Sequence, residues 1–350
     1  MFPMPSPADI TLPVPVADSP GLSASREGSV EISVVVPIYR EAESVGPLCD
    51  RLVPVLERVA SSFEVLFVDD GSTDGTLAAI RARHALDSRI VAISFSRNFG
   101  KEIAIAAGLD HARGRAVVIM DADLQHPPET IAAFVERWRD GNVMVYGQRT
   151  DRRDESAVKR GFTHAFYRLF ARFGETSLPE GAGDFRLIDR KGVEVLRALG
   201  ERARFSKGLY AWIGFRSVGV PFEVEERRFG ATKWSFRRLF RFAFDGMTSF
   251  STVPLRVWTY LGVLISFLSI ATAIYFALRT LFFGTDVPGY PSLIVSVMFF
   301  SGIQLMSLGI IGEYVGRIFA EVKRRPLYVV GDTVGRPVAA PFREERRRTS

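Results

Sequence analysis

Two carboxylates one residue apart follow an apolar run in the stretch VIMDADLQHPPE. Asp121 and Asp123 come directly after the apolar residues, and Gln125 stands two positions further on. Carboxylate and amide oxygens are the ligands that hard divalent cations such as Mg²⁺ and Mn²⁺ prefer. Such an ion keeps coordination positions for substrate phosphate, so it can neutralise a diphosphate leaving group. The spacing predicts a metal site; the alternative is a pair of acidic residues in a turn before two prolines.

A second group of polar residues closes two other apolar runs. Asp69 ends FEVLFVD, and Pro37, Tyr39 and Glu41 follow ISVVV. Acidic side chains collected at one edge of a sheet are costly unless a cation or a hydrogen-bond donor meets them. We therefore expect Asp69 and Glu41 to contact a ligand, and Pro37 and Tyr39 to line a pocket for a base and its ribose.

Basic residues in the stretch SRNFGKE suggest an anion site. Arg97 and Lys101 lie between a β-branched run and a stretch with helical spacing. The unpaired backbone N–H groups at the start of a helix bind anions, so this position suits a phosphate. Structural capping by Asn98 is the alternative. The four histidines show no ligand spacing, and His126 is interpreted as a loop residue.

The elements that must position these residues alternate regularly. Short β-branched runs (ISVVVP, FEVLFVDD, IVAISFS, AVVIMDAD and VMVYG) are separated by helical spacing at residues 41–60, 75–86, 101–112 and 128–139. This alternation predicts an α/β fold with a mostly parallel sheet covered on both faces. Ligands of such sheets bind at the carboxyl ends of the strands, where Asp69, Asp121 and Asp123 stand.

The composition indicates a globular protein and leaves the partner open. Of the 350 residues, 47% are hydrophobic and 24% are charged, as in a folded domain rather than a disordered chain. The net charge of +6 suits a phosphorylated substrate, an anionic membrane or a nucleic acid equally well. The single cysteine, Cys49, rules out an intrachain disulfide and a cysteine-based metal cluster.

Two long apolar stretches follow the alternating part. Val257 to Leu278 carries no charge and would span about 33 Å as a helix, which exceeds the roughly 30 Å of a bilayer core. A second uncharged stretch runs from Val287 to Gly312. We expect residues 255–315 to form two transmembrane helices; a pair of buried core helices is the alternative.

The charges around these stretches predict the orientation and the remaining segments. Basic residues flank both stretches on their outer sides, and the loop between carries only Arg279 and Asp286, so both termini and residues 31–232 are expected in the cytoplasm at the inner membrane. Residues 233–254 alternate aromatic residues with arginines, which predicts an interfacial amphipathic helix or an ordinary surface helix. Residues 1–30, interrupted by prolines, are expected to be a disordered arm, and residues 316–350 a basic cytoplasmic segment.

Several motifs in order strengthen one interpretation. The stretches VVPIYREAESV, VDDGSTDGT, SRNFGKE, DADLQHPPE, GQR, GDFRLIDR and RRFGATKWSF, followed by two spans, resemble a family 2 glycosyltransferase of the polyprenyl-phosphate type. Dolichyl-phosphate mannose synthases and bacterial undecaprenyl-phosphate glucosyltransferases belong to this group. The resemblance covers about residues 31 to 325. It implies a GT-A nucleotide-binding domain, a nucleotide-sugar donor, Mg²⁺ or Mn²⁺, and a polyprenyl phosphate acceptor in the bilayer.

The resemblance also implies a role for each motif. The donor nucleotide would be bound by Pro37, Tyr39, Glu41, Asp69 and Asp121. The metal would be held by Asp121, Asp123 and Gln125. Asp184 of GDFRL, beside the sugar, and Asp123 would be catalytic. Phosphates and the acceptor would be bound by Arg149, Arg228, Lys233, Arg97 and Lys101. Where such relatives often have serine before the lysine of the basic loop RRFGATKWSF, this chain has Thr232 before Lys233, which keeps the hydroxyl.

These expectations define a reaction. The acceptor phosphate is already anionic, so no strong general base is needed, and Asp184 is expected to orient the substrates and stabilise positive charge at the anomeric carbon. One displacement inverts the anomeric centre. UDP-glucose is the preferred donor, with UDP-galactose, GDP-mannose and a modified UDP-pentose left open. Nucleic acid is not an expected partner, whereas a flippase, a periplasmic glycosyltransferase and a homo-oligomer stay open.

Three other functions compete with this one. A processive polysaccharide synthase shares the donor site but is usually marked by a Q-x-x-R-W motif, which this chain lacks. A metal-dependent nucleotidyltransferase would release pyrophosphate instead of a nucleoside diphosphate. A non-catalytic scaffold would bind nucleotide sugars without transferring them.

Overall fold

A computed structural model describes residues 30–150, 182–201, 204, 206–225 and 289–335, with scattered residues between 262 and 282. The predicted N-terminal arm and the predicted interfacial helix at 233–254 lie outside the described residues, as do Arg228 and Lys233.

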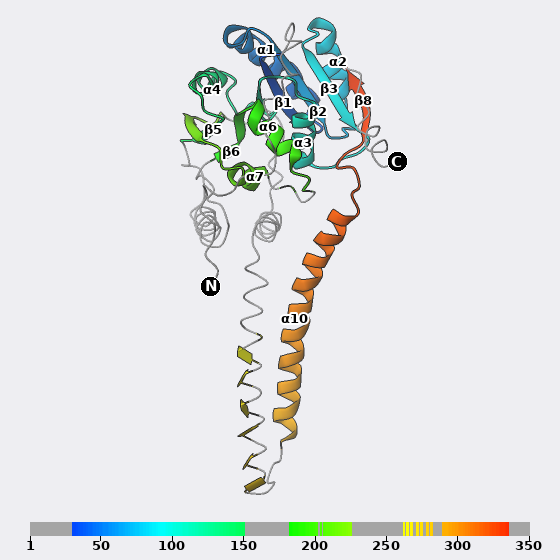
Figure 1. The fold of residues 1–350 in the computed structure, drawn as a ribbon. Coiled ribbons are helices and arrows are strands. Elements are labelled where there is room, and N and C mark those ends of the chain that lie inside the picture. The colour runs from blue at the N-terminus through cyan, green and yellow to red at the C-terminus, as the bar shows by residue number, and fades with distance from the viewer. Residues whose placement is uncertain are drawn as a thin grey trace, which may run out of the picture.

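The described strands form one eight-stranded sheet in the order β7-β5-β6-β4-β1-β2-β3-β8 (Figure 1). The strands are β1 (Ile32–Ile38), β2 (Phe63–Asp69), β3 (Ile90–Phe95), β4 (Ala116–Ile119), β5 (Met144–Arg149), β6 (Ala182–Asp189), β7 (Ser217–Phe222) and β8 (Val330–Val334). The helices are α1 (Ala42–Val59), α2 (Thr76–Leu86), α3 (Lys101–His111), α4 (Thr130–Arg139), α6 (Arg190–Ala198), α7 (Ser206–Trp212) and α10 (Tyr290–Val322).

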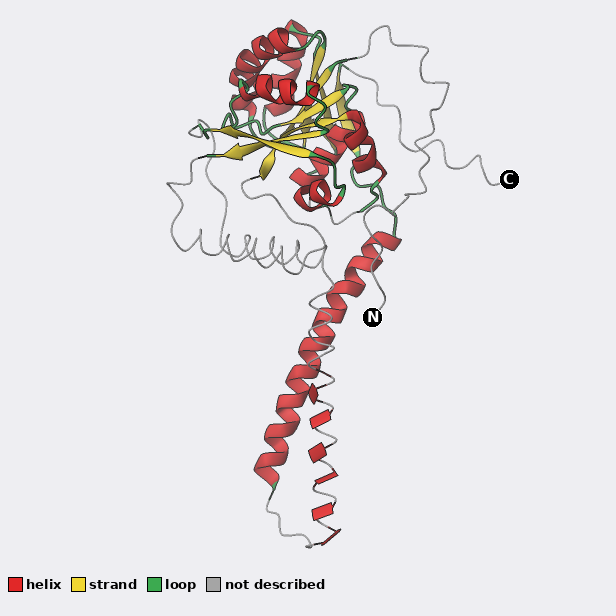
Figure 2. Ribbon diagram, turned by 60° about the vertical axis from the view of Figure 1, so that its left-hand side comes forward, coloured by secondary structure: helices red, strands yellow, loops and turns green. Residues whose placement is uncertain are grey.

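The central strands confirm the predicted α/β fold. Strands β4, β1, β2 and β3 pair in parallel, and every residue of these four is buried. Helices α1, α2 and α4 pack on one face of the sheet and α3, α6 and α7 on the other, so the core forms two layers (Figure 2). Continuous β-branched runs are therefore needed, because both faces of each central strand meet helices.

Strand β6 departs from the parallel pattern and matters for the site. It pairs antiparallel with both β4 and β5, and its register places Arg186 opposite Ile119, the last residue of β4. The first half of β6 therefore runs on past the carboxyl end of β4. This extension carries Asp184 to the sheet edge where Asp121 follows β4.

Strand β8 was not predicted, because the C-terminal segment was expected to be only a basic tail. It pairs antiparallel with the edge strand β3, and Ser96 N–H donates to the Val329 carbonyl at 2.9 Å. The Tyr328 ring stacks on Phe95 with a centroid distance of 5.1 Å, and its hydroxyl donates to Asp110. The chain thus returns from α10 to complete the sheet.

Helix α10 projects away from the sheet as a long single rod (Figures 1 and 2). It continues past Gly312, where the second uncharged stretch ends, and past residue 315, the predicted end of the two spans, to Val322. Large apolar side chains such as Phe299, Leu305 and Ile318 are exposed along it. Within the described part of the chain, one helix, Ser296–Val322, is long and apolar enough to cross a bilayer. The first predicted span falls mostly outside the described residues, so the structure does not establish a pair of spans.

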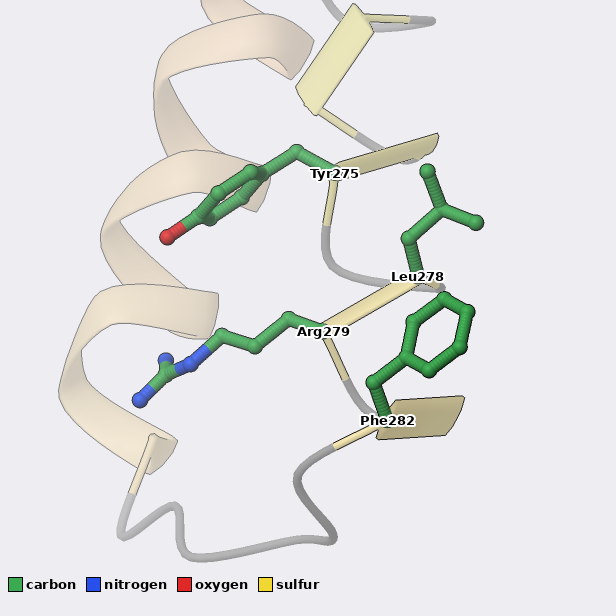
Figure 3. A pocket seen from close by; sticks show the side chains of 4 residues that line it. All are labelled: Tyr275, Leu278, Arg279 and Phe282. Atoms are coloured by element: carbon green, nitrogen blue, oxygen red, sulfur yellow. The ribbon is translucent and has the colours of Figure 1, made fainter.

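A hollow of about 500 Å³ lies away from the sheet, beside described residues that precede α10 in the chain (Figure 1). It is lined by Tyr275, Leu278, Arg279 and Phe282 (Figure 3). Tyr275 and Arg279 extend to one side of their backbone and Leu278 and Phe282 to the other. Among the described residues of this lining there is no carboxylate and no predicted site residue, and the predicted acidic residues lie at the sheet instead.

Candidate active site

The predicted acidic residues meet at one edge of the sheet. The register pairs Ile38 at the end of β1 with Asp69 at the end of β2, and β4 runs parallel on the other side of β1. Tyr39 and Asp121 lie in the segments that follow β1 and β4, and Asp69 is the last residue of β2, as the alternation of elements predicted. The carboxyl edge is therefore the candidate site.

Asp69 is fully buried and organises the turn that follows β2. One carboxylate oxygen accepts a hydrogen bond from the Ser72 N–H at 3.0 Å, and the other accepts from the Ser94 hydroxyl at 2.6 Å. Both oxygens therefore have partners within the protein. Sequence reasoning predicted a ligand contact for Asp69, and the geometry adds a structural role.

Tyr39 and Glu41 begin the loop between β1 and α1. Pro37 is a buried residue of β1, whereas the Tyr39 side chain is exposed. The Arg40 guanidinium lies 5.2 Å from the Tyr39 ring, and Arg40 has a φ of 54°, which turns the chain sharply. The Glu41 N–H donates to the Thr76 hydroxyl at 3.1 Å. An exposed aromatic ring at this edge can stack on a base.

Asp70 fixes the loop that leads into α3, a role that the sequence did not reveal. Its carboxylate accepts from the N–H groups of Phe99 at 2.6 Å and Gly100 at 2.9 Å. Burial raises the pKa of Asp70. Gly71, at a φ of 69°, lies so close to the Arg97 backbone that an added Cβ would overlap it. The Arg97 guanidinium itself is exposed and lies 4.4 Å from the Phe99 ring.

The turn after β4 holds its two aspartates in different settings. Asp123 is 5% exposed and accepts from the Gln125 N–H at 3.1 Å, whereas Asp121 is partly exposed. Leu124, which follows Asp123, is fully buried and has a φ of 61°, a conformation that costs a non-glycine residue energy. Burial of the Leu124 side chain holds this strained turn in place.

His126 supports the same turn from behind. Its ring stacks on Phe185 at a centroid distance of 4.8 Å and meets Phe222 edge-on at 5.7 Å. The Asp121 N–H points to its Nδ1 at 3.4 Å. Burial lowers the pKa of His126, so the neutral ring is favoured. This packing agrees with its interpretation as a loop residue.

Lys101 joins the two key carboxylates. Its ammonium lies 2.6 Å from Asp121 Oδ1 and 3.1 Å from Asp184 Oδ2. Burial alone would lower the pKa of Lys101, but these two carboxylates raise it above its usual value. Lys101 was predicted to bind phosphate, and the structure places it between a predicted metal ligand and the predicted catalytic residue.

Asp184 is kept ionised by the cations around it. Burial alone would raise its pKa, but Lys101, Lys207 and Arg186 together lower the pKa of Asp184 to about 2. Its side chain is 16% exposed, and its Oδ1 has no hydrogen-bond partner among the described residues. An anionic oxygen of this kind suits a sugar hydroxyl or a developing positive charge.

A buried polar cluster that the sequence did not predict lies beneath Asp184. Arg186 is 3% exposed, lies 3.6 Å from the centroid of the Tyr210 ring and donates to the Gly183 carbonyl at 2.5 Å. Glu102 accepts from the N–H of Ser206 at 3.0 Å. The sequence held one signal for this cluster. In the stretch GDFRLID, Arg186 stands two residues before the apolar Ile188 and therefore, in a strand, on the same face, so it could have been predicted to be buried, and a buried charge needs specific partners.

The oxygen ligands at this edge fit a hard divalent cation. Within the described ranges, no cluster of three or more histidine, cysteine or acidic side chains is arranged to hold a metal by itself. Asp121 and Asp123 would supply two carboxylates, and Gln125 was predicted to add an amide oxygen. A set with so few protein ligands suits Mg²⁺ or Mn²⁺ shared with a substrate diphosphate.

The structure brings together part of the predicted set. Asp121, Asp123, Lys101 and Asp184 converge at the ends of β4 and β6. Arg149 is exposed at the end of β5. The two predicted phosphate-binding residues near the membrane, Arg228 and Lys233, are not among the described residues.

Comparisons with known proteins show what this chain is similar to. Residues 33–197 match the family described as Glycosyl transferase family 2. An uncharacterized glycosyltransferase of Synechocystis sp. is 48% identical over 307 residues, covering 88% of this chain and 96% of its own length. The SfII prophage-derived bactoprenol glucosyl transferase of Shigella flexneri is 42% identical over 301 residues, covering 86% of this chain and 97% of its own length.

A solved structure shows a more distant likeness. The mannosyltransferase PcManGT from Pyrobaculum calidifontis, solved in complex with GDP-Man and Mn²⁺, aligns over 84% of this chain and 88% of its own at 20% identity, with a TM-score of 0.44. The sequence relatives match almost their whole length at more than twice that identity.

Proposed function

This chain belongs to glycosyl transferase family 2, and from that membership we propose that it transfers one sugar from a nucleotide-sugar donor to polyprenyl phosphate, with inversion. The relative from Shigella flexneri is named a bactoprenol glucosyl transferase, which supports a polyprenyl acceptor and glucose as the sugar. UDP-glucose is the donor that we propose first. The observation that carries the proposal is the Lys101-bridged pair of Asp121 and Asp184 at the carboxyl edge of the sheet.

The donor would lie across the carboxyl ends of the strands. The exposed Tyr39 ring would stack on the base, and Glu41 and Asp69 would line the nucleoside site. Asp121, Asp123 and Gln125 would hold Mg²⁺ or Mn²⁺, which when bound supplies positive charge to the donor diphosphate. The described residues support this through an all-oxygen ligand set.

The chemical step would be one displacement. A phosphate oxygen of the acceptor forms a bond to the anomeric carbon while the bond from that carbon to the diphosphate breaks, and the nucleoside diphosphate leaves. The acceptor oxygen is already anionic, so no proton has to be removed. Asp184, with its pKa near 2, remains an anion at neutral pH and stabilises positive charge at the anomeric carbon.

Helix α10 supports a membrane location for the reaction. The described part of this helix exposes large apolar side chains over its whole length, a surface that is unfavourable in water. An apolar polyprenyl chain stays in the bilayer, so the enzyme has to meet its phosphate at the surface. We propose two spans in the inner membrane, with the catalytic domain and both termini in the cytoplasm.

The test uses the full chain purified in detergent. Undecaprenyl phosphate and a panel of UDP and GDP sugars are supplied with Mg²⁺ or Mn²⁺, and lipid mass and nucleoside diphosphate are measured. We expect a lipid that gains one sugar, lost in Asp121→Asn and Asp123→Asn but kept in the exposed control Asp140→Asn. Released pyrophosphate, a polymer, or bound donor without any lipid product would each contradict the proposal.

A further inference from the structure

Lys101 contacts both a proposed metal ligand, Asp121, and the proposed catalytic residue, Asp184. It is the first residue of α3, directly after the loop that Asp70 holds through Phe99 and Gly100. The Lys101 backbone is therefore fixed, while its side chain is 44% exposed and has four methylene groups that can swing. The ammonium can thus change partners although its attachment point stays still.

The two carboxylates that Lys101 contacts differ in their expected ligands. Asp121 is one of the two carboxylates at the end of β4 that would hold the divalent cation. Asp184 belongs to β6 and has two further cations nearby, Lys207 and Arg186, which help to lower its pKa. A divalent cation on Asp121 and an ammonium 2.6 Å from the same carboxylate repel each other strongly. The divalent cation and the Lys101 ammonium therefore compete for Asp121, whereas the ammonium has no such competitor at Asp184.

We propose that Lys101 and the divalent cation compete for Asp121, and that Lys101 moves from Asp121 to the donor diphosphate as the cation binds, keeping Asp184 as its second partner. This inference rests on the proposed function. It assigns Lys101 as a positioning residue that couples cation binding to diphosphate binding. The exchange leaves the number of positive charges around Asp184 unchanged.

This exchange predicts opposite changes for two ligands. Removing the Lys101 charge takes a competitor away from Asp121, so the cation binds more tightly when no nucleotide is present. The same change takes a positive charge away from the diphosphate, so the nucleotide binds more weakly when the cation is saturating. A purely structural ion pair would weaken both, because its loss disturbs the whole edge of the sheet.

The experiment measures both affinities on the full chain in detergent. Mn²⁺ binding is followed by the electron paramagnetic resonance of free Mn²⁺, and UDP and GDP binding by calorimetry at saturating Mn²⁺. For Lys101→Met and Lys101→Gln we expect Mn²⁺ to bind about three- to tenfold more tightly and the preferred nucleotide about three- to tenfold more weakly. Circular dichroism confirms that each variant is folded, and the Gln variant serves if Met at this position disturbs the fold.

Lys207→Met is the matched control, because it removes a positive charge near Asp184 from helix α7. We expect it to change Mn²⁺ affinity less than about twofold. Equal tightening in Lys101→Met and Lys207→Met, or weaker Mn²⁺ binding in Lys101→Met, overturns the inference. Wild-type sugar transfer in the same preparation separates the two proposals: transfer without the opposite changes rejects only the Lys101 role, whereas no binding of Mn²⁺ or nucleotide rejects both.

Discussion

Asp184 shows how a buried carboxylate stays charged without a single dedicated partner. Burial opposes its ionisation, yet Lys101, Lys207 and Arg186 overcome that effect together and lower its pKa to about 2. Of these three, only Lys101 lies within ion-pairing distance in the structure. The charge of Asp184 therefore depends on the field of a cluster, and losing one cation would leave two.

Replacing Asp184 by asparagine tests the role of this charge. Asp184→Asn keeps the shape of the side chain but removes the anion that would face the anomeric carbon, so we expect sugar transfer to fall about 100- to 10,000-fold. The affinity for the nucleoside diphosphate should change little, because the proposed nucleoside site lies at the ends of β1 and β2. Steady-state transfer and calorimetry measure the two effects separately.

A control is available on the outer surface of the domain. Asp50→Asn removes an exposed carboxylate that pairs with Arg83 at 2.6 Å, and transfer should remain near the wild-type rate. Wild-type transfer by Asp184→Asn would show that another group stabilises the reacting carbon.

Sequence reasoning found the acidic residues but not their contacts. Asp121, Asp123 and Asp184 were identified from motifs, and the structure brings all three to one edge. The bridging position of Lys101 could not be predicted, because it depends on the direction of a long side chain and on the register of a strand far along the chain. Arg186 and Tyr210 were missed for a similar reason, since their contact joins β6 to α7.

At the scale of elements, α3 owes its position to a glycine. Gly108 faces β1 so closely that an added Cβ would overlap the Val35 side chain, which is fully buried. This contact between Gly108 and Val35 sets the distance between α3 and the sheet. Since Lys101 is the first residue of α3, the same contact sets how far its ammonium reaches.

Substituting Gly108 tests this packing. Alanine gains up to about 1 kcal/mol of helix propensity, but overlap with a stiff β-branched neighbour costs about 1–3 kcal/mol, so we expect Gly108→Ala to be destabilising overall. Thermal unfolding in detergent measures the change. In the control Gly200→Ala the new Cβ meets no atom within 4 Å, and the change should stay within about 0.5 kcal/mol. A Gly108→Ala protein as stable as the wild type would mean that α3 shifts without cost.

The elements that periodicity predicts well are those that are buried. The β-branched runs of β1 to β4 and the helical spacings of α1 to α4 were identified to within a few residues, because a fully buried strand or an amphipathic helix leaves a strong pattern. Strand β8 leaves no such pattern. In its sequence VGDTV only the last residue, Val334, is buried, and its partner β3 lies far away in the sequence. The antiparallel position of β6 between β4 and β5 could not be predicted either, because the pairing of strands depends on segments that are far apart in the sequence.

At the scale of the whole molecule, β8 ties the catalytic domain to helix α10. The segment from α10 to β8 is short, and Tyr328 within it stacks on Phe95 and donates to Asp110. The other side of β3 pairs with β2, whose end carries Asp69. The contacts that join α10 to the domain through β8 therefore lie two strands away from the proposed nucleoside residue Asp69.

Truncation tests this connection. A chain ending at Arg325 loses β8 and leaves the β3 edge unpaired, so we expect the melting temperature to fall by about 5 to 10 °C and the protein to aggregate more readily. A chain ending at Gly335 keeps β8 and should melt like the full chain. Equal melting of the two chains would show that β8 contributes no stability. Thermal scans and light scattering measure both effects.

Because β8 comes late in the chain, its pairing with β3 is delayed during biosynthesis. The ribosome makes β3 early, but its partner β8 emerges only after the whole of α10. At about 5 to 20 residues per second, the nascent domain waits with an open sheet edge for a time on the order of tens of seconds. During that time the ribosome also makes the apolar helix α10. The last strand thus acts as a closing step, which can pair with β3 only after α10 has been synthesised.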